Sequence, residues 1–390
     1  QRGGPKRVYD FVVAGAGAAG LSVAFHLARF GSVAVLDTEA RPCIHSTGRS
    51  AALMELSYGN ETLRQLTMMS RDFLASTFEA SFFSERGSLV FCRPGETEEL
   101  REFTSQAGSF TPVELLNASE VLQLCPILRP ELVAGGMYEP GSMSIDVHAL
   151  MESYRQAAKR LGVDFLFNTP IKRGREVSGT WSLEAGSQGD TTLHAGTLVN
   201  AAGAWADELA TSVGAVPLGL SPLRRTAFTF AVPAGLSLSR FPCISPMVED
   251  WYAAPQGRSL MGSPADETSS APCDAMPDEL DIATAIANIH RDTTLNITRL
   301  ESRWAGLRTV ASDRVPVVGL DATANAPFVW FAGQGGHGIQ GCEAMARVAL
   351  AACVGGDVEV CGGEAATMAR LQRAMRPGRL RGLRRSRQSV

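Results

Sequence analysis

Three closely spaced glycines near the start of the chain could bind the phosphates of a dinucleotide. Gly15, Gly17 and Gly20 form a GxGxxG pattern directly after the apolar run 8–14. The first glycine of such a turn permits the bend, the second lets the backbone approach a pyrophosphate, and the third lets a helix pack against the strand. Asp37 follows the next apolar run, 33–36, and could accept a hydrogen bond from a ribose 2′-hydroxyl. The pattern therefore favours an unphosphorylated ribose, as in FAD or NAD, over NADP.

The chemistry of this turn requires a strand before it and a helix after it. Residues 8–14 predict the strand, and 21–30 predict the helix. Two similar junctions follow much later: a strand at 197–200 that enters a small-residue turn, and a strand at 328–332 that leads through a glycine-rich turn into a helix over 339–353. Ligands bind at the carboxyl ends of parallel strands, so we expect the three junctions to meet on one face of a sheet.

Segments of a different character lie between these junctions. Residues 84–145 and 217–303 are richer in proline and in short strand patterns. We therefore expect an α/β protein made of two interleaved domains. A Rossmann-like nucleotide-binding domain would comprise 1–83, 146–216 and 304–390, and a mixed-sheet substrate domain of α+β character would comprise 84–145 and 217–303. The stretch 262–281 predicts a surface loop.

The composition is typical of a cytoplasmic enzyme. The 390 residues carry a formal net charge of −4, and 45% of them are hydrophobic. No apolar run reaches the roughly 18 residues that a membrane span needs, and no cleavable signal precedes the first strand. The eight cysteines include no CxxC pair, so we expect reduced thiols rather than a zinc site or a disulfide framework. The histidines show no ligand spacing, and no metal is expected.

The C-terminal segment is unusually basic. From Arg370 to Val390 the sequence has eight arginines and no acidic residue. Pro377, Gly378 and Gly382 break any regular helical face, which favours a solvated C-terminus. The alternative is a docking arm for an acidic partner or a nucleic acid. We prefer the first interpretation and expect no nucleic-acid partner.

Five motifs give the chain a resemblance to a known family. They are the glycine turn 15–20, the run HSTGRSAA at 45–52, NAAGAW at 200–205, WAGLR at 304–308 and GGHGIQ at 335–340. Together they resemble the FAD flavoproteins of the D-amino-acid oxidase, glycine oxidase and sarcosine oxidase family, and most of all the bacterial D-arginine dehydrogenases. The resemblance covers about residues 9–352. It implies the glutathione-reductase-like fold of the D-amino-acid-oxidase type.

The resemblance implies that FAD binds in an extended pose. Noncovalent binding is expected, although some relatives carry the flavin on a histidine in this part of the chain, where His45 stands here. The turn 336–340 would direct backbone N–H groups and a helix N-terminus at the flavin ring, where reduced flavin carries negative charge. The residues expected to bind FAD, those of the glycine turn included, are Gly15, Gly17, Ala18, Ala19, Gly20, Asp37, His45, Ser46, Thr47, Arg49, Ser50, Ala51, Ala52, Ile171, Ala201, Ala202, Gly203, Trp205, Gly335, Gly336, His337, Gly338, Ile339 and Gln340.

The implied chemistry is oxidation of a bond between an α-carbon and nitrogen. A hydride would leave Cα for the flavin, and water would convert the resulting imine into a 2-oxo acid and ammonia. Arg225, Arg308 and Tyr252 match the family's clamp for the substrate carboxylate, which guanidinium groups suit. Tyr58 would line the substrate side of the flavin, and the Gly336 carbonyl would accept from the amine. Arg224, beside Arg225, is expected to be a solvated neighbour.

The side-chain pocket differs from that of the D-arginine enzymes. Ser88 stands where those enzymes place a glutamate, Leu53 where they place a histidine, and His337 where they place a tyrosine. A buried cation without a partner is disfavoured, so Ser88 and Leu53 predict a neutral or apolar D-amino acid. Glu55 stands where those enzymes place a threonine. It works against the neutral substrate, because it could supply a new anion at a different depth of the pocket.

Two other substrate classes remain open. The same fold and clamp would suit N-methylated or cyclic amino acids, which are secondary amines. A 2-hydroxy acid, or a role as one subunit of an electron-transfer complex, is the other alternative. The electron acceptor, whether oxygen, a quinone or another carrier, is not predicted.

Overall fold

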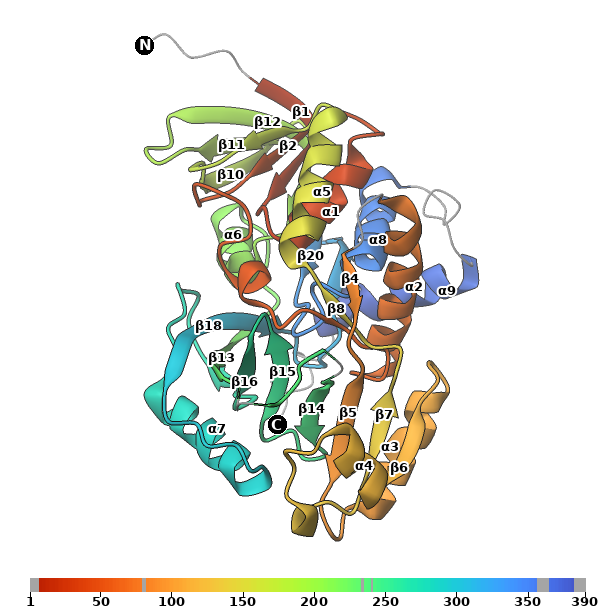
Figure 1. The fold of residues 1–390 in the computed structure, drawn as a ribbon. Coiled ribbons are helices and arrows are strands. Elements are labelled where there is room, and N and C mark those ends of the chain that lie inside the picture. The colour runs from red at the N-terminus through yellow and green to blue at the C-terminus, as the bar shows by residue number, and fades with distance from the viewer. Residues whose placement is uncertain (1–6, 79–81, 233–234, 240, 356–364, 382–390) are drawn as a thin grey trace, which may run out of the picture.

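The computed structural model describes residues 7–78, 82–232, 235–239, 241–355 and 365–381. Its strands form a sheet of eight strands, a sheet of nine and a small sheet of three. Figure 1 shows the eight-stranded sheet at the top of the view and the nine-stranded sheet at the bottom. The chain passes between the two sheets several times, so segments far apart in sequence meet where the sheets face each other.

The eight-stranded sheet has a parallel centre. Its strands are β1 (Arg7–Ala14), β2 (Val33–Leu36), β9 (Asp164–Leu166), β10 (Ile171–Val177), β11 (Thr180–Ala185), β12 (Thr191–Asn200), β19 (Val317–Leu320) and β20 (Phe328–Ala332). The order β9-β2-β1-β12 is parallel, and β20 continues it beside the end of β12. The three predicted junctions follow β1, β12 and β20, and these neighbouring strands bring them to one edge of the sheet.

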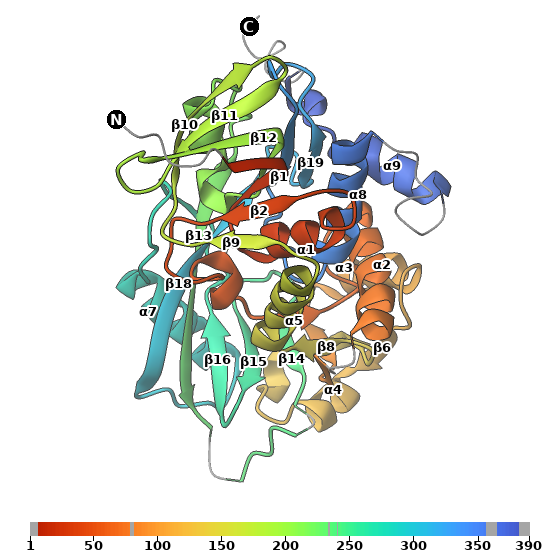
Figure 2. The ribbon, with the colours of Figure 1, turned by 90° about the horizontal axis from the view of Figure 1, so that it is seen from above.

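Helices cover both faces of this sheet, which is why β2 and β20 are buried at every residue. One face packs against α1 (Ala18–Leu27), α5 (Val147–Arg160) and α8 (Cys342–Val354), and α6 (Ala206–Ser212) packs on the other. Figure 2 shows α1 next to β2 and β9, with α5 and α8 beside it. The helices α2 (Glu61–Thr77) and α9 (Ala365–Met375) pack against α8.

The nine-stranded sheet forms the wall opposite. Its strands are β5 (Ser88–Cys92), β6 (Glu114–Asn117), β7 (Gly135–Glu139), β13 (Ser221–Ala231), β14 (Cys243–Pro246), β15 (Tyr252–Gln256), β16 (Ser259–Ser263), β17 (Thr268–Ser269) and β18 (Leu300–Val310). The helices α4 (Ala118–Leu124) and α7 (Glu279–Asp292) share one core cluster with this sheet, and α3 (Thr97–Gly108) packs in another. A small sheet of β3 (Leu53–Met54), β8 (Met143–Ile145) and β4 (Phe83–Glu85) connects the two parts.

The structure differs from the predicted segment boundaries at β18. The sequence division places residues 304–390 in the nucleotide-binding domain, but β18 pairs with β13 along its length, from Ser221 opposite Val310 to Phe230 opposite Leu300. Residues 304–310 therefore belong to the nine-stranded sheet. The stretch predicted as a surface loop, 262–281, includes β17 and the buried Ala275. The division into two domains itself stays a prediction.

Three further observations concern the described residues alone. No helix there is both long and apolar enough to cross a membrane. No group of three or more His, Cys, Asp or Glu side chains is arranged to hold a metal ion. The seven cysteines of these ranges are free thiols, and Cys361 lies outside the described residues.

Candidate active site

The glycine turn has no room for larger residues. Gly15 has a φ of 108°, and a Cβ there would lie 2.4 Å from the Ala201 carbonyl oxygen at the second junction. A Cβ at Gly20 would lie 1.8 Å from the Gly15 carbonyl oxygen. Helix α1 begins after Gly17, which has no side chain to cap it, and the Ala18 N–H donates to Thr47 Oγ1, so the N–H groups of Ala19 and Gly20 are the ones that could face an anion. This glycine-lined turn fits the pyrophosphate of FAD.

Asp37 lies beside this turn at the end of β2. Its Oδ2 accepts from the Ala16 N–H at 2.6 Å, and its Oδ1 accepts from the Glu39 N–H at 2.9 Å. Burial raises the pKa of Asp37 above its usual value. Each carboxylate oxygen has a further lone pair, which leaves room for the predicted bond from a ribose hydroxyl. Glu39, which the sequence did not single out, lies 2.9 Å from His45 Nε2.

The HSTGRSAA run connects the glycine turn to β18. Thr47 Oγ1 accepts from the Ala18 N–H at 3.1 Å, and Ser46 Oγ donates to the Leu307 carbonyl at 2.6 Å. The Arg49 guanidinium donates to the Ala305 carbonyl at 2.8 Å and pairs with Asp274. The side chain of Arg49, which the resemblance predicts to bind FAD, therefore binds the backbone of β18.

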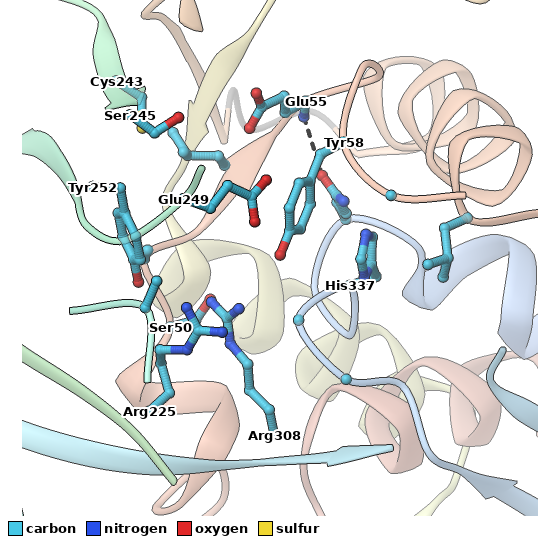
Figure 3. A pocket seen from close by; sticks show the side chains of 18 of the residues that line it. Ser50, Glu55, Tyr58, Arg225, Cys243, Ser245, Glu249, Tyr252, Arg308 and His337 are labelled. Carbon is cyan, nitrogen blue, oxygen red and sulfur yellow. Dashed lines mark hydrogen bonds between the residues drawn. The ribbon is translucent and has the colours of Figure 1, made fainter. Parts of the chain in front are cut away.

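A cavity of about 490 Å³ lies next to this run (Figure 3). A smaller cavity of about 110 Å³ shares a wall with it and extends to Ala18 and Gly203 at the first two junctions. Together the two cavities extend from the N-terminus of α1 to strands β5 and β14 of the nine-stranded sheet. This shape suits a cofactor in an extended pose with a substrate beyond it.

The structure brings together every residue predicted to act on the substrate. The large cavity is lined by Leu53, Glu55, Tyr58, Ser88, Arg225, Tyr252, Arg308, Gly336 and His337. Of the residues expected to bind FAD, those that line one or both cavities are Ala18, Ser46, Thr47, Arg49, Ser50, Ala51, Ala52, Gly203, Gly335, Gly336, His337, Gly338, Ile339 and Gln340. Those outside both linings are Gly15, Gly17, Ala19, Gly20, Asp37, His45, Ile171, Ala201, Ala202 and Trp205. These individual assignments stay predictions.

The strand pairing explains why the two clamp arginines meet. Arg308 on β18 lies opposite Leu223 on β13, and Arg225 is two residues further along β13. Residues two apart in a strand share a face, so both guanidinium groups point into the cavity, where they lie close together (Figure 3). Arg224 points to the opposite face, where it contacts Asp281 at 2.8 Å and Asp278 at 3.3 Å. The neighbour predicted to be solvated is thus an ion-paired residue outside the cavity.

The clamp has more positive than negative charge. Arg225 lies 3.4 Å from Glu267, which also pairs with Arg314. Within the described residues the buried Nε of Arg225 has no hydrogen-bond partner. Burial and the neighbouring Arg308 lower the pKa of Arg225. Two adjacent cations of this kind are stabilised by a carboxylate that accepts from both.

Tyr58 and His337 form the wall beside the clamp. Their rings stack with centroids 4.6 Å apart and planes 11° apart. Burial raises the pKa of Tyr58 even though the Arg308 charge opposes this, so the hydroxyl is protonated and can donate. Burial, followed by the charge of Arg308, lowers the pKa of His337 to about 3. At neutral pH both rings are therefore uncharged.

Carboxylates occupy the other side of the cavity. Ser88 Oγ donates to Glu55 Oε1 at 2.7 Å, and the Glu55 N–H donates to Gln340 Oε1 at 3.1 Å. Glu249 lines the same cavity, and Figure 3 shows its carboxylate pointing inward between Tyr252 and Tyr58. The sequence did not single out Glu249 or Glu267, because neither belongs to a motif or to a periodic pattern.

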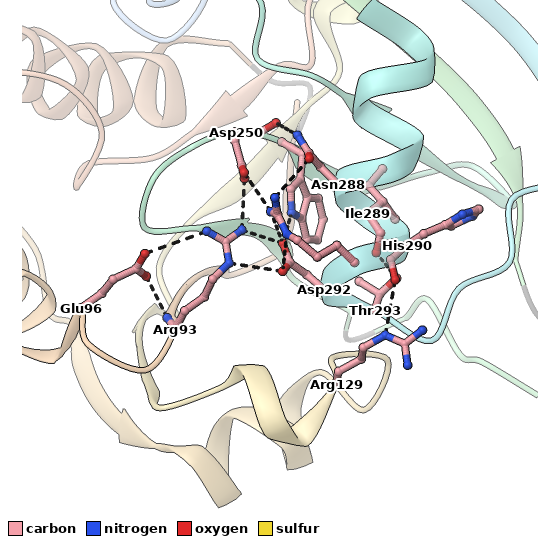
Figure 4. Close-up of polar contacts among 11 residues, drawn as sticks. Arg93, Glu96, Arg129, Asp250, Asn288, Ile289, His290, Asp292 and Thr293 are labelled. Atoms are coloured by element: carbon pink, nitrogen blue, oxygen red, sulfur yellow. Dashed lines mark hydrogen bonds and ion pairs between the residues drawn. The ribbon is translucent and has the colours of Figure 1, made fainter.

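A charged network holds the segment that carries Glu249 and Tyr252 (Figure 4). The buried Asp292 accepts from Trp251 Nε1 and from Arg93 Nη2, each at 2.7 Å. Asp250 lies 3.2 Å from Arg93 and 2.8 Å from Arg291. Burial alone would raise the pKa of Asp292, but hydrogen bonds from Arg291, Arg93 and Trp251 lower it to about 2. These contacts fix Asp250 and Trp251, which stand between the cavity-lining residues Glu249 and Tyr252.

Known proteins resemble this chain in sequence and in fold. The family described as "DAO: FAD dependent oxidoreductase" matches residues 10–352. The chain is 24% identical over 264 residues to the mitochondrial dimethylglycine dehydrogenase of Rattus norvegicus, which covers 65% of this chain and 30% of that protein. It is 27% identical over 244 residues to the glycine oxidase of Geobacillus kaustophilus, which covers 58% of this chain and 63% of that protein. The chain thus spans only part of the length of these relatives.

A solved structure has the same fold. The L-proline dehydrogenase from P. horikoshii superposes with a TM-score of 0.79 over 91% of this chain and 96% of that chain, at 19% identity. The predicted fold class, a Rossmann-like FAD-binding fold with an interleaved mixed sheet, is confirmed.

Proposed function

The chain belongs to the family of FAD-dependent oxidoreductases, and on that premise we propose that it oxidises the bond between the α-carbon and nitrogen of an amino acid. The observation that carries the proposal is the pair of guanidinium groups, Arg225 and Arg308, in a cavity that adjoins the glycine junctions. A substrate carboxylate bound there would fix the α-carbon beside the flavin ring, and such positioning accounts for much of the rate of hydride transfer. FAD, when bound, supplies the acceptor for the hydride.

The chain's own residues would bind and orient the substrate. Arg225 and Arg308 would donate to the two carboxylate oxygens, and the hydroxyls of Tyr58 and Tyr252 could donate to the same group. The Gly336 carbonyl would accept a hydrogen bond from the amine. Because Tyr58 keeps its proton, it serves as a donor and not as a base. The amine would react in its neutral form, and water would then hydrolyse the imine to a 2-oxo acid and ammonia.

The stereochemistry and the class of amine are finer parts of the proposal. The motif resemblance to D-arginine dehydrogenases favours a D-amino acid. Secondary amines form the second candidate class, supported by the likeness to proteins named dimethylglycine dehydrogenase and L-proline dehydrogenase. The same clamp would hold the carboxylate in either case, and the oxidised bond would be Cα–N or N–methyl.

Flavin bleaching tests the function directly. The purified protein should be yellow and should release FAD into the supernatant on acid precipitation; colour left in the pellet would indicate a covalent bond. Under anaerobic conditions we expect bleaching by at least one member of a panel of D- and L-amino acids, sarcosine and proline. Dye reduction and peroxide release, measured in parallel, identify a dehydrogenase or an oxidase. Bleaching by a 2-hydroxy acid alone would contradict the proposal.

A further inference from the structure

The large cavity has opposite charges on its two sides. Arg225 and Arg308 form the cationic side, and Glu55 and Glu249 form the anionic side (Figure 3). The sides are built from different parts of the chain: the arginines from the paired strands β13 and β18, and the carboxylates from the segments after β3 and β14. A ligand that spans the cavity would therefore meet cations at one end and anions at the other.

The anionic side lacks a cation of its own within the described residues. Ser88 and Ser57 both donate to Glu55 Oε1, at 2.7 and 3.4 Å, and no described group donates to Oε2. Neither Glu55 nor Glu249 forms an ion pair in these parts of the chain. Glu249 is held there with a φ of 49°, a left-handed conformation that non-glycine residues adopt at a cost. Two neighbouring carboxylates without a counter-charge attract a cation from outside.

Arg64 is the nearest candidate for an internal counter-charge, and it does not fill that role. It lines the same cavity, but its guanidinium lies over the rings of Phe103 and Phe110, 5.9 and 5.5 Å from their centroids. Its charge acts on Glu139 instead, whose carboxylate already accepts the N–H groups of Leu56 and Ser57. The oxygens that remain open to a ligand cation are those of Glu55 and Glu249.

We propose that Glu55 and Glu249 bind a positively charged group at the end of the substrate's side chain. The proposal rests on the proposed function, because the carboxylate clamp sets which end of the substrate points toward Glu55. The substrate class is then an amino acid with a basic side chain, an ammonium or a guanidinium. In this arrangement the anion absent at Ser88 is supplied by Glu55, and Ser88 orients it through their hydrogen bond. Leu53 and Val90 would pack against the methylene groups between the two charges.

The ionisation of Glu55 adds a signature to this site. Burial, and then the charges of Glu139 and Glu249, raise the pKa of Glu55 to about 7, although the bond from Ser88 opposes this. The charge of Glu55 in turn acts on the Cys243 thiol, whose pKa burial raises, and Arg64 and Tyr58 line the same cavity. A substrate cation favours the ionised carboxylate. Preference for basic over neutral substrates should therefore increase as the pH rises through about 7.

The test measures flavin reduction in the holoenzyme by stopped flow, without oxygen. Both enantiomers of lysine, arginine, leucine, methionine and glutamate are compared at pH 6 and pH 8.5. The quantity compared is the rate of flavin reduction divided by the dissociation constant of the substrate. We expect it to be roughly 10- to 100-fold higher for lysine or arginine than for leucine, because a charge-assisted hydrogen bond contributes a free energy of that size. Glu55→Gln should lower the rate with lysine and arginine far more than the rate with leucine, and so abolish that ratio and its pH dependence.

A matched control separates this effect from general damage. Glu114→Gln removes an exposed carboxylate on β6, outside the cavity, and should leave the lysine-to-leucine ratio unchanged. Flavin content shows that each variant is folded. If leucine reduces the flavin as well as or better than lysine, and Glu55→Gln does not change this, the inference is wrong. The neutral-substrate prediction would then stand again, and the proposed function would remain intact. If glutamate reduces the flavin fastest, the inference is also wrong, and Arg64 would be the residue that binds the end of the side chain. No reduction by any amino acid would contradict the proposed function itself.

Discussion

At the scale of single residues, the site depends on two like charges held side by side. Arg225 and Arg308 repel each other in a buried place, and Glu267 offsets only part of their charge. The pairing of β13 with β18 places them side by side. The free energy spent on that arrangement is recovered when a carboxylate enters, so the clamp discriminates strongly in favour of anions.

Replacing Arg308 with methionine should therefore remove transition-state binding. We expect a loss of about 3–5 kcal/mol, the usual cost of truncating one partner of a buried charge pair. In steady-state kinetics with the best substrate, kcat/KM would fall by roughly two to four decades. Arg224→Met, on the other face of β13, is the control and should retain activity per bound flavin. Near-normal turnover by Arg308→Met would show that the carboxylate binds elsewhere.

His337 should make the protein sensitive to acid. Its pKa is about 3 in the folded protein, below the ordinary value of 6.5, because burial and Arg308 disfavour the charged ring. The unfolded chain thus binds a proton that the folded chain does not. Stability is complete above pH 6.5 and falls by about 1.4 kcal/mol per pH unit as the pH drops from there toward 3. Denaturation curves of the native protein and of His337→Asn, between pH 4 and 8, should differ in this slope; equal slopes would refute the shift.

The sequence alone could predict the clamp but not the whole cavity. Arg308 belongs to a recognisable motif, whereas Glu249 lies in no motif and stands next to a segment that the network around Asp292 fixes. Glu55 and Ser88 could each be assigned to the pocket. Their hydrogen bond could not, because it requires β3 and β5 to approach each other through pairings between distant parts of the chain.

At the scale of elements, the strand-to-helix junctions are what the sequence predicts best. Each combines an apolar run, a small-residue turn and a helix, all of them local, and β1, β12 and β20 lie side by side as expected. The assignment of β18 was harder. An 11-residue strand whose residues 304–310 alternate in burial can pair with either sheet, and only its partner β13 settles the choice. The register of that pairing in turn places Arg308 beside Arg225.

The first junction offers a sharp test of close packing. In Gly20→Ala the new methyl group would lie 1.8 Å from the Gly15 carbonyl oxygen, so α1 must move away from β1. We expect a loss of at least about 1–3 kcal/mol in unfolding free energy, together with weaker FAD retention. The ratio of flavin to protein absorbance and the Tm report the two effects. Gly141→Ala, with nothing within 4 Å of its added methyl, should change neither; if both variants behave alike, the close approach has no role.

At the scale of the whole molecule, the site lies between two sheets that the chain visits in turn. Arg49 and Ser46, in the run after the eight-stranded sheet's β2, bind carbonyl groups of β18 in the nine-stranded sheet. The C-terminal segment contacts the eight-stranded sheet through two arginines. Arg379 pairs with Asp313, and Arg381 pairs with the buried Asp321, which also accepts from Trp330 Nε1 at 2.9 Å. Among the described arginines of the basic tail, Arg370, Arg379 and Arg381 therefore pair with the chain's own carboxylates, and these residues are not simply solvated as predicted. Residues 382–390 lie outside the described residues.

Removing this last contact should destabilise the whole protein. In Arg381→Met the Asp321 carboxylate keeps its bonds from Trp330 and Thr323 but loses its cation. Since Arg381 is partly exposed, we expect a loss of about 1–3 kcal/mol, less than for a fully buried pair. Arg373→Met, at an exposed position of α9, should stay within about 0.5 kcal/mol. Equal stability of the two variants in urea would show that Arg381 contributes nothing.

The position of Arg381 has a consequence for the chain as it leaves the ribosome. Its partner Asp321 also holds Trp330 in β20, the strand that leads into the glycine-rich turn of the third junction. Until that arginine has emerged, the third junction lacks its final support, although the first junction was synthesised hundreds of residues earlier. The early βαβ segment must therefore wait, with apolar surface uncovered, for residues that are synthesised much later. Such delayed closure is typical of chains that benefit from chaperones, and it favours cofactor capture as a late event, after Arg381 has left the ribosome.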